Sequence, residues 1–417
     1  RSPEPLPWVP EGEVDWSIFP FGVLVGDVGS QSAVVQVHAE LETSIIQWVL
    51  VVGQAEEWIE AQAGECSTGD IHPKTTRIEL DGLESDQVYS IVLKRADQPL
   101  QRSSVTRFRT ALADQDWRIV KFAVTSCFGG NRPFPSLSHV ADEKVDFVCY
   151  LGDLVYADGS ATEDEYWWHW KRTLSQSGMR ALNASASMIA TWDDHEFTNN
   201  YNPAETPQAE LIYQMGLRNF RRAIPQRVES NDGIWRALNY GDVLDVFVLD
   251  CRTERSTEQY VSPQQLDWLK QSLTASTARF KILLNSVPIS DFTDLIGEIE
   301  AVDRWQGYAA QRTELLSHIE ENQITGVLWL AGDFHFGMVA KVGRVGELGD
   351  GMYEVLCGPA GSFINIMGEL LIPSEQFQLP VAEWNTTVFT CNPEQGSVTV
   401  SFIGDEGQEH ATKTLQL

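Results

Sequence analysis

The stretch Tyr150-Leu-Gly-Asp-Leu-Val-Tyr-Ala-Asp158 decides the fold of this chain. Residues 145–150, which lead into it, form an almost continuous apolar run, typical of a parallel strand buried on both faces. Gly152 lets the backbone turn, so Asp153 stands just past the strand end, where open α/β sheets bind ligands. Tyr156 follows and can turn back toward the same point. An aspartate and a phenol at such a turn indicate a hard metal ion.

The composition indicates a globular protein with a large core and an acidic surface. The chain has 417 residues, 43% of them hydrophobic, which leaves room for one large domain and one small one. Its formal net charge of −29 excludes binding through a nucleic-acid backbone, and any phosphate chemistry would need local cations, most simply metals. The sequence has no apolar run of about 18 residues or more, so we predict no transmembrane segment.

The N-terminus and the cysteines bear on localisation. The chain begins Arg1-Ser-Pro-Glu-Pro-Leu-Pro7, without Met. We expect a secreted or periplasmic protein whose targeting segment has been removed, although a trimmed sequence would look the same. The cysteines show neither Cys-x-x-Cys pairs nor zinc-finger spacing. A disulfide that involves Cys66 stays open.

Residues 20–110 have the pattern of a small all-β module, in which short alternating runs are separated by turn residues. Strands are predicted at 32–38, 44–52, 75–80, 88–94 and 104–110. The stretch Asp81–Tyr89 resembles the loop of a fibronectin-type or Ig-like sandwich in which a tyrosine hydroxyl pins a corner. Residues 111–116 have the composition of a linker. We therefore predict an N-terminal segment and β-sandwich at 1–112 and a catalytic domain at 113–417.

Beyond residue 116, apolar strands separated by helical stretches predict an α/β fold. Strands are predicted at 119–126, 145–152, 188–192, 242–250, 280–287, 326–331, 353–357, 387–391, 398–403 and 412–417. Helices are predicted at 136–144, 163–176, 209–222, 263–272 and 308–322.

Polar side chains gather where several of these strands end. The first strand is followed by Cys127 and two nearby glycines, although a cysteine here is often only a packing residue. The third leads into Thr191-Trp-Asp-Asp-His-Glu-Phe-Thr-Asn-Asn200, a polar cluster too dense for helix capping alone. Asn285 lies near the end of the strand at 280–287 and is either a ligand or structural. Asp333 and His335 are two residues apart, so an extended backbone would direct both to one side.

These candidate ligands fall into two sets that share one carboxylate. Phenolate favours a ferric ion, and a thiolate with an imidazole also accepts iron or zinc. The set of this kind comprises Cys127, Asp153, Tyr156 and His335. Calcium, magnesium and manganese prefer oxygen ligands. The all-oxygen set comprises Asp153, Asp194, Asn285 and Asp333. Asp153 would bridge two ions about 3.5–4 Å apart, an arrangement used for phosphoester hydrolysis.

With these motifs, the chain resembles the PhoD-type alkaline phosphatases and phosphodiesterases of the metallophosphoesterase superfamily. The resemblance covers nearly the whole chain, and its motifs stand in the family's order. The matching blocks are Thr125-Ser-Cys127, Gly152-Asp-Leu-Val-Tyr156, Trp192-Asp-Asp-His-Glu196 with Asn199-Asn200, Leu249-Asp-Cys-Arg252 and Gly332-Asp-Phe-His335. Two departures are the Phe-Gly-Gly that follows Cys127 and the strand-like end at Leu417, where some relatives carry a helix that lids the site.

The resemblance implies a four-layer α-β-β-α sandwich with a dinuclear site of iron(III) and calcium, in which zinc, manganese or magnesium are alternatives. It assigns the two ligand sets to iron and calcium respectively, and leaves the choice between Asp193 and Asp194 open. His195 is the candidate acid for the departing alkoxide. Asn199, Asn200 and Arg252 are candidates for orienting phosphate oxygens, but Arg252 would equally suit a buried ion pair.

Three functions follow as expectations. The first is an extracytoplasmic phosphatase that releases phosphate from monoesters or diesters. The second is a phosphodiesterase or phospholipase D-like hydrolase that acts on bulkier lipid or nucleotide diesters, which an open site would admit. The third, from another class, is a secreted binding protein in which the β-module binds and the hydrolase domain is inactive. Neither the physiological ester nor the oligomeric state is predicted from the sequence.

Overall fold

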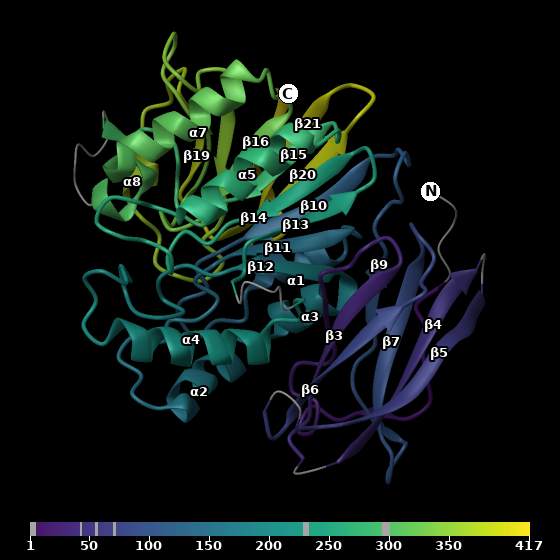
Figure 1. The fold of residues 1–417 in the computed structure, drawn as a ribbon. Coiled ribbons are helices and arrows are strands. Elements are labelled where there is room, and N and C mark those ends of the chain that lie inside the picture. The colour runs from purple at the N-terminus through teal and green to yellow at the C-terminus, as the bar shows by residue number, and fades with distance from the viewer. Residues whose placement is uncertain (1–5, 42–43, 55–56, 70–71, 228–232, 294–300) are drawn as a thin grey trace.

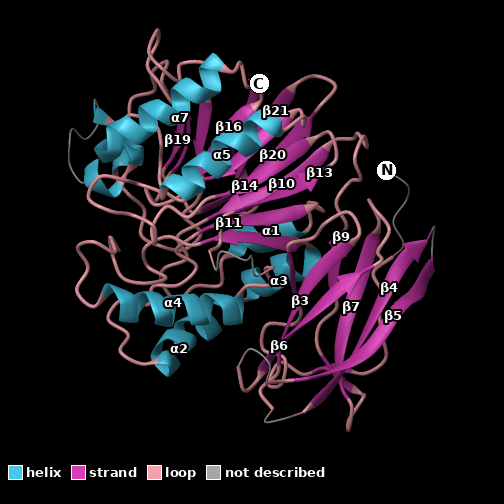
Figure 2. Ribbon diagram, in the orientation of Figure 1, coloured by secondary structure: helices cyan, strands magenta, loops and turns pink. Residues whose placement is uncertain are grey.

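Two β-sheets packed face to face, with helices on both outer faces, form the larger part of the molecule (Figures 1 and 2). The computed structural model describes residues 6–41, 44–54, 57–69, 72–227, 233–293 and 301–417. This arrangement confirms the predicted α-β-β-α sandwich with a small all-β region at the N-terminus. Among the described residues, no helix has the length and apolarity needed to cross a membrane.

The first sheet has nine strands in the order β22-β21-β20-β10-β11-β12-β2-β3-β6. Its central strands β10, β11 and β12 are parallel and fully apolar or nearly so, as expected for a sheet covered on both faces. The bounds are β2 Leu24–Gly26, β3 Ser32–His38, β6 Thr75–Asp81, β10 Val120–Thr125, β11 Phe147–Leu151, β12 Ser187–Thr191, β20 Asn385–Asn392, β21 Ser397–Gly404 and β22 Glu409–Gln416.

The second sheet has seven strands in the order β13-β14-β15-β16-β18-β17-β19. Here β14, β15, β16 and β18 are parallel neighbours. The bounds are β13 Arg236–Tyr240, β14 Leu244–Val248, β15 Phe280–Leu284, β16 Val327–Ala331, β17 Gly337–Lys341, β18 Tyr353–Leu356 and β19 Phe377–Val381.

Helices cover the outer face of each sheet. The nine-stranded sheet is covered by α1 Pro135–Ala141, α2 Glu163–Leu174, α3 Ser177–Ser185 and α4 Ala209–Ala223. The seven-stranded sheet is covered by α5 Pro263–Ala275 and α7 Ala309–Glu321. The short elements are η1 Ala301–Asp303, η2 Trp305–Tyr308 and α8 Met367–Leu370.

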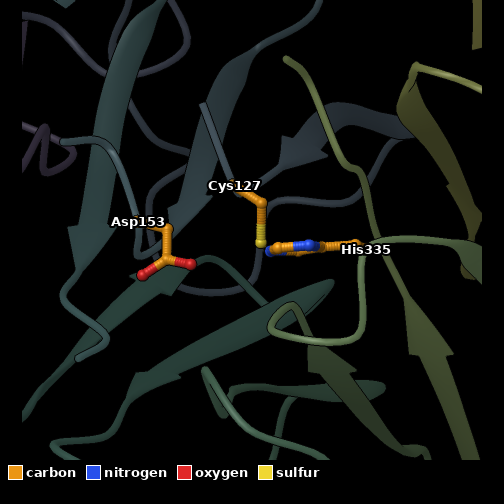
Figure 3. A group of neighbouring side chains, drawn as sticks. All are labelled: Cys127, Asp153 and His335. Carbon is orange, nitrogen blue, oxygen red and sulfur yellow. The ribbon is translucent and has the colours of Figure 1, made fainter. Parts of the chain in front are cut away.

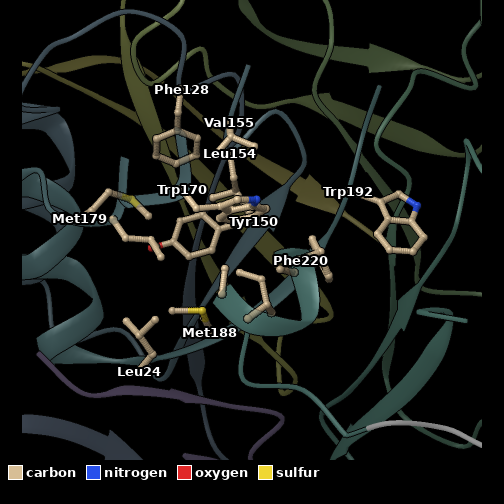
Figure 4. Packing of buried hydrophobic residues seen from close by; sticks show 14 of the residues in the cluster. Leu24, Phe128, Tyr150, Leu154, Val155, Trp170, Met179, Met188, Trp192 and Phe220 are labelled. Carbon is tan, nitrogen blue, oxygen red and sulfur yellow. The ribbon is translucent and has the colours of Figure 1, made fainter. Parts of the chain in front are cut away.

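Aromatic side chains fill the space between these layers. Between the sheets, Phe122 stacks with both Phe147 and Phe389 at ring-centroid distances of 5.0 Å. Under the helices on the nine-stranded sheet, Phe220 packs edge-on against Trp170 and Trp192 (Figure 4). Trp170 and Trp192, two of the chain's 14 tryptophans, therefore pack in this core.

The N-terminal module is a β-sandwich that shares a sheet with the rest of the chain. One of its layers is a six-stranded sheet of β1 Glu13–Val14, β4 Ile45–Gln54, β5 Glu57–Ser67, β7 Val88–Arg95, β8 Gln101–Arg102 and β9 Thr106–Arg109. The other layer is β2, β3 and β6, and a core of buried residues lies between the two layers. Since β2 pairs with β12 through Gly26 and Met188, the predicted boundary at residue 112 separates two parts of one continuous sheet.

Two smaller predictions concern this region and the cysteines. The hydroxyl of Tyr89 accepts a hydrogen bond from the backbone N–H of Glu84 at 2.9 Å, so it pins its corner as expected. The six cysteines all lie in the described part of the chain, and none of them forms a disulfide.

Candidate metal centre

The candidate ligands come together where the carboxyl ends of the parallel strands of both sheets meet. Cys127, Asp153 and Asp194 follow β10, β11 and β12 of the nine-stranded sheet. Asp333 and His335 follow β16 of the other sheet. Among the described residues, three groups of side chains each bring their ligand atoms within 4.8 Å of one another. The groups are Cys127, Asp153 and His335; Asp153, Asp194 and His195; and Asp193, Asp194 and Asp333.

The first group combines sulfur, nitrogen and oxygen (Figure 3). Cys127 and Asp153 are both 1% exposed, and His335 is 8% exposed. Tyr156 joins them, because its hydroxyl donates to Asp153 Oδ2 at 3.1 Å and lies 3.2 Å from His335 Nε2. The set predicted for iron or zinc is therefore one compact cluster.

The backbone at these positions is unusual. Cys127, Asp153, Asp333 and His335 have φ of 56°, 52°, 63° and 57°, which places all four in the left-handed region. Residues other than glycine adopt this region at a cost, and such conformations gather at functional sites. The turns therefore hold these side chains at the site at the expense of local backbone energy.

Asp193 and Asp194 differ in how much of their hydrogen-bonding capacity the protein uses. Asp193 Oδ1 accepts from Arg252 Nε at 2.5 Å and from Ser286 Oγ at 3.0 Å, and its Oδ2 accepts from Arg252 at 3.0 Å. Asp194 Oδ2 accepts from the backbone N–H of Asn200, whereas Asp194 Oδ1 is buried without a hydrogen-bond partner among the described residues. The geometry thus favours Asp194 as the cation ligand.

Arg252 is a buried counter-ion of acidic side chains, and it does not line the cavity that opens onto the candidate ligands. Its side chain is 0% exposed and pairs with Asp193 and Asp303. One guanidinium nitrogen also lies 3.6 Å from Asp194 and 3.5 Å from Asp333. The predicted contact between Arg252 and a phosphate oxygen finds no support in this geometry, and the alternative of a buried ion pair describes its position, with Asp193 and Asp303 as partners.

Asn285 follows β15 but directs its amide oxygen elsewhere. Asn285 Oδ1 accepts from Trp305 Nε1 at 2.8 Å and from the Cys251 thiol at 3.1 Å. Its side chain is completely buried. Because that oxygen already has two donors, the geometry does not support Asn285 as a member of the all-oxygen set, which leaves Asp153, Asp194 and Asp333.

His195 is held beside the cluster by a carboxylate. Its Nδ1 lies 2.6 Å from Asp158 Oδ2, and its ring stacks on Tyr156 with the centroids 4.0 Å apart. Burial alone would lower the pKa of His195, but the hydrogen bond to Asp158 and the charges of Asp153 and Asp194 raise that pKa to about 10. The hydrogen bond to Asp158 therefore favours the protonated imidazole, which is the form that donates a proton.

The pKa directions of the buried groups test whether the site suits a cation. Burial raises the pKa of Asp153 well above its ordinary value, and the nearby charge of Asp194 raises it further. Burial, followed by the charge of Asp153, likewise raises the pKa of the Cys127 thiol. A bound cation acts in the opposite direction, since it favours deprotonated ligands. The buried acidic groups, together with Asp194 Oδ1, which has no hydrogen bond among the described residues, therefore fit a metal centre.

A cavity of about 420 Å³ opens onto this cluster and has two chemically distinct sides. The polar side includes Asp153, Asp194, His195, Asn199, Asn200, Asp303, Arg304, Asp333, His335 and Asn365. The apolar side is formed by Phe292, Phe334, Phe336, Phe363, Met367 and Leu371. A ligand with a charged head and an apolar group would match both sides.

Several residues around the site had no role in the sequence predictions. Asp158 closes the stretch that decides the fold, and its nearness to Tyr156 was a signal that went unused. Glu196 lies in the polar cluster after β12, and no local pattern indicates its hydrogen bonds to the backbone of Asp153 and Leu154. Asp303 pairs with Arg252 across 51 positions in sequence, and no local pattern indicates that pairing.

Comparison with known proteins assigns the chain to a family. The PhoD-like phosphatase model matches residues 122–405, which is more than half of the sequence. The chain belongs to the PhoD-like phosphatase family.

Individual relatives are distant in sequence but close in fold. Alkaline phosphatase D of Bacillus subtilis (strain 168) is 24% identical over 313 residues, which is 63% of this chain. The chain spans about half, 53%, of the length of that relative. A solved structure of PhoD shares 20% identity with a TM-score of 0.81, covering 97% of this chain and 90% of that one. Purple acid phosphatase PPD1 from yellow lupin (Lupinus luteus) seeds is 12% identical with a TM-score of 0.67, covering 94% of this chain and 74% of that one. These two likenesses establish the shared fold.

Proposed function

We propose that this chain hydrolyses phosphoesters at a two-cation site in which Asp153 is the shared ligand. The observation that carries the proposal is that Asp153 belongs to two groups of potential ligand atoms, one with Cys127 and His335 and one with Asp194. Iron(III) suits the first group, with its thiol, phenol and imidazole, and calcium suits the carboxylates. Zinc, manganese and magnesium are the alternatives.

The residues around the cation sites would donate a proton to the leaving group and orient the phosphate. When bound, the cations supply positive charge that activates water and neutralises the phosphate oxygens. His195, held by Asp158, protonates the departing alkoxide at the cavity wall. Asn199 and Asn200 line the same cavity and present amide groups to phosphate oxygens. Export from the cytoplasm, expected from the family resemblance, stays a prediction.

The test is metal analysis combined with hydrolysis of p-nitrophenyl phosphate and bis(p-nitrophenyl) phosphate. Asp153→Asn should lose both metal equivalents and all activity, because it removes the shared charge. Asp267→Asn, on the exposed face of α5, is the matched control and should keep both. Full activity in Asp153→Asn would end the proposal. A wild-type protein that takes up no metal and cleaves neither ester would instead favour a binding module over an inactive hydrolase domain.

His195→Ala separates an acid from a ligand. We expect this variant to retain its metal and to lose rate, most severely for esters with poor leaving groups, because they depend most on protonation. Loss of metal in His195→Ala would make His195 a ligand instead.

The apolar side of the cavity supports a second candidate, a diesterase that acts on bulky esters. Phe334, Phe336 and Leu371 line the same cavity as the candidate ligands, so an apolar second substituent on phosphorus could pack against them. On this candidate, Leu371→Ala should raise KM for an alkyl or aryl diester more than KM for a small monoester. Equal KM changes for the two substrates would favour the monoesterase.

A further inference from the structure

The buried carboxyl group of Glu196 lies next to the candidate ligands and, among the described residues, accepts hydrogen bonds from backbone groups alone. Its side chain is 0% exposed. Glu196 Oε2 accepts from the backbone N–H of Asp153 at 3.0 Å and of Asp193 at 2.8 Å. Glu196 Oε1 accepts from the backbone N–H of Leu154 at 2.6 Å. One side chain thus joins the loop after β11 to the loop after β12.

The contact explains how Asp153 keeps its left-handed backbone. With Asp153 at φ 52°, the N–H groups of residues 153 and 154 both point at the Glu196 carboxylate. Successive N–H groups in such a turn form a concave anion-binding site. Glu196 supplies the acceptor oxygens for that site from within the chain, and its three hydrogen bonds offset part of the cost of burying the carboxyl group and of the left-handed conformation.

An independent observation shows how closely the two loops approach. A Cβ atom added to Gly152 would lie 2.3 Å from the backbone nitrogen of Asp193. The loops are therefore in direct backbone contact, and a small displacement of either would move Asp153 relative to Asp194. Glu196 hydrogen-bonds to both loops at this contact. The side chain of Asp153 adds a second link, since its Oδ1 accepts from the backbone N–H of His195 at 3.3 Å.

We propose that Glu196 is a positioning residue that sets the cation affinity of the centre by holding Asp153 between the two ligand groups. The inference rests on the proposed function, because it assumes that the centre binds cations. Replacing a partner that orients a metal ligand typically lowers metal affinity about 10- to 100-fold. Glu196→Gln keeps the size of the side chain but replaces one of its two acceptor oxygens with an NH₂ group, which cannot accept from a backbone N–H, so Asp153 is held less firmly.

The chain offers a matched control in Glu354. This residue of β18 is also 0% exposed, and its carboxylate accepts from two successive backbone N–H groups, Ile289 at 2.9 Å and Ser290 at 3.0 Å. It is absent from the three groups of potential ligand atoms. Glu354→Gln therefore reports the effect of losing a buried, backbone-bound carboxylate that holds no candidate ligand.

The experiment is a titration of metal-free full-length protein with Co²⁺, followed by the absorbance that arises when the Cys127 thiolate binds. We expect Glu196→Gln to bind Co²⁺ about 10- to 100-fold more weakly than wild type, and Glu354→Gln to bind with wild-type affinity. If Glu196→Gln does not fold, Glu196→Asp keeps the charge on a shorter side chain, and it too should weaken binding. Wild-type affinity in a folded Glu196 variant would overturn the inference. Failure of the wild-type protein itself to bind Co²⁺ would overturn the proposed function, and the inference with it.

Discussion

Arg252→Met tests how much the guanidinium of Arg252 contributes to the free energy of unfolding by pairing with the buried carboxylates next to the candidate metal centre. Arg252 makes two charge-assisted hydrogen bonds to the buried Asp193, at 2.5 and 3.0 Å, and a third to Asp303. Hydrogen bonds to charged groups contribute about 1.5–3 kcal/mol each, so the pair on Asp193 contributes about 3–6 kcal/mol. Removing one partner of a buried ion pair costs about 3–5 kcal/mol by a separate route. Because Asp303 keeps Arg255 as a partner, we expect the free energy of unfolding to fall by about 3–5 kcal/mol.

The assay is equilibrium urea unfolding followed by tryptophan fluorescence, with a chelator present so that metal binding does not contribute. Lys270→Met is the control, because its partners Glu314 and Asp267 are exposed and such pairs contribute less than about 1 kcal/mol. The double variant Asp193→Asn/Arg252→Met should recover part of the loss, since it removes the stranded charge. A loss below about 1 kcal/mol in Arg252→Met would refute the reasoning.

Three further predictions concern the core, the pH dependence and the candidate acid. Phe122→Ala, which empties the stacked centre of the inter-sheet core, should lower the free energy of unfolding by about 3–5 kcal/mol in the same urea assay. Burial lowers the pKa of His38, although the contact with Glu40 acts in the opposite direction. As the pH falls, His38 is therefore protonated more readily in the unfolded chain than in the folded one. Stability should therefore fall as pH is lowered through about 6.5, and urea midpoints of His38→Gln should fall less over the same range. Asp158→Asn should lower kcat while metal content stays unchanged, by less than the roughly 10²–10⁴-fold expected for loss of the acid His195 itself; loss of metal in this variant would contradict the assignment.

The fold was predictable because the central strands β11 and β16 are continuous apolar runs, and their neighbours β10, β12, β14 and β15 each contain at most two polar residues. Such segments have few stable locations other than a covered sheet. Strand β5 was missed because it is an edge strand with the sequence Glu-Trp-Ile-Glu-Ala-Gln-Ala-Gly-Glu-Cys-Ser, and most of its side chains face water. Strands β1, β2, β8, β13, β17 and β19 and helices α3 and α8 were also missed. The continuity of the sheet across residue 112 was not predictable, since it depends on one pairing between Gly26 and Met188.

The candidate ligands were predictable because a polar residue that directly follows an apolar strand has only the sheet edge as its location. The positions of Cys127 and Asp153 follow from that rule. Asp333 and His335 also reach the site, but on left-handed backbone and not on the extended backbone that was expected for them. The partners of Arg252 and the orientation of Asn285 depend on contacts between distant loops, which a local pattern does not encode. The role of Glu196 depends on the left-handed backbone at Asp153, which only the folded chain reveals.

The single pairing between β2 and β12 gives the N-terminal module a protective task. All five residues of β12 are buried, and without β2 this strand would become the terminal strand of its sheet. An apolar terminal strand with unpaired backbone groups is a template for self-association. A fragment that begins at residue 113 would therefore tend to precipitate even if its catalytic residues were intact, so the module is a condition of solubility for the hydrolase and not a detachable accessory.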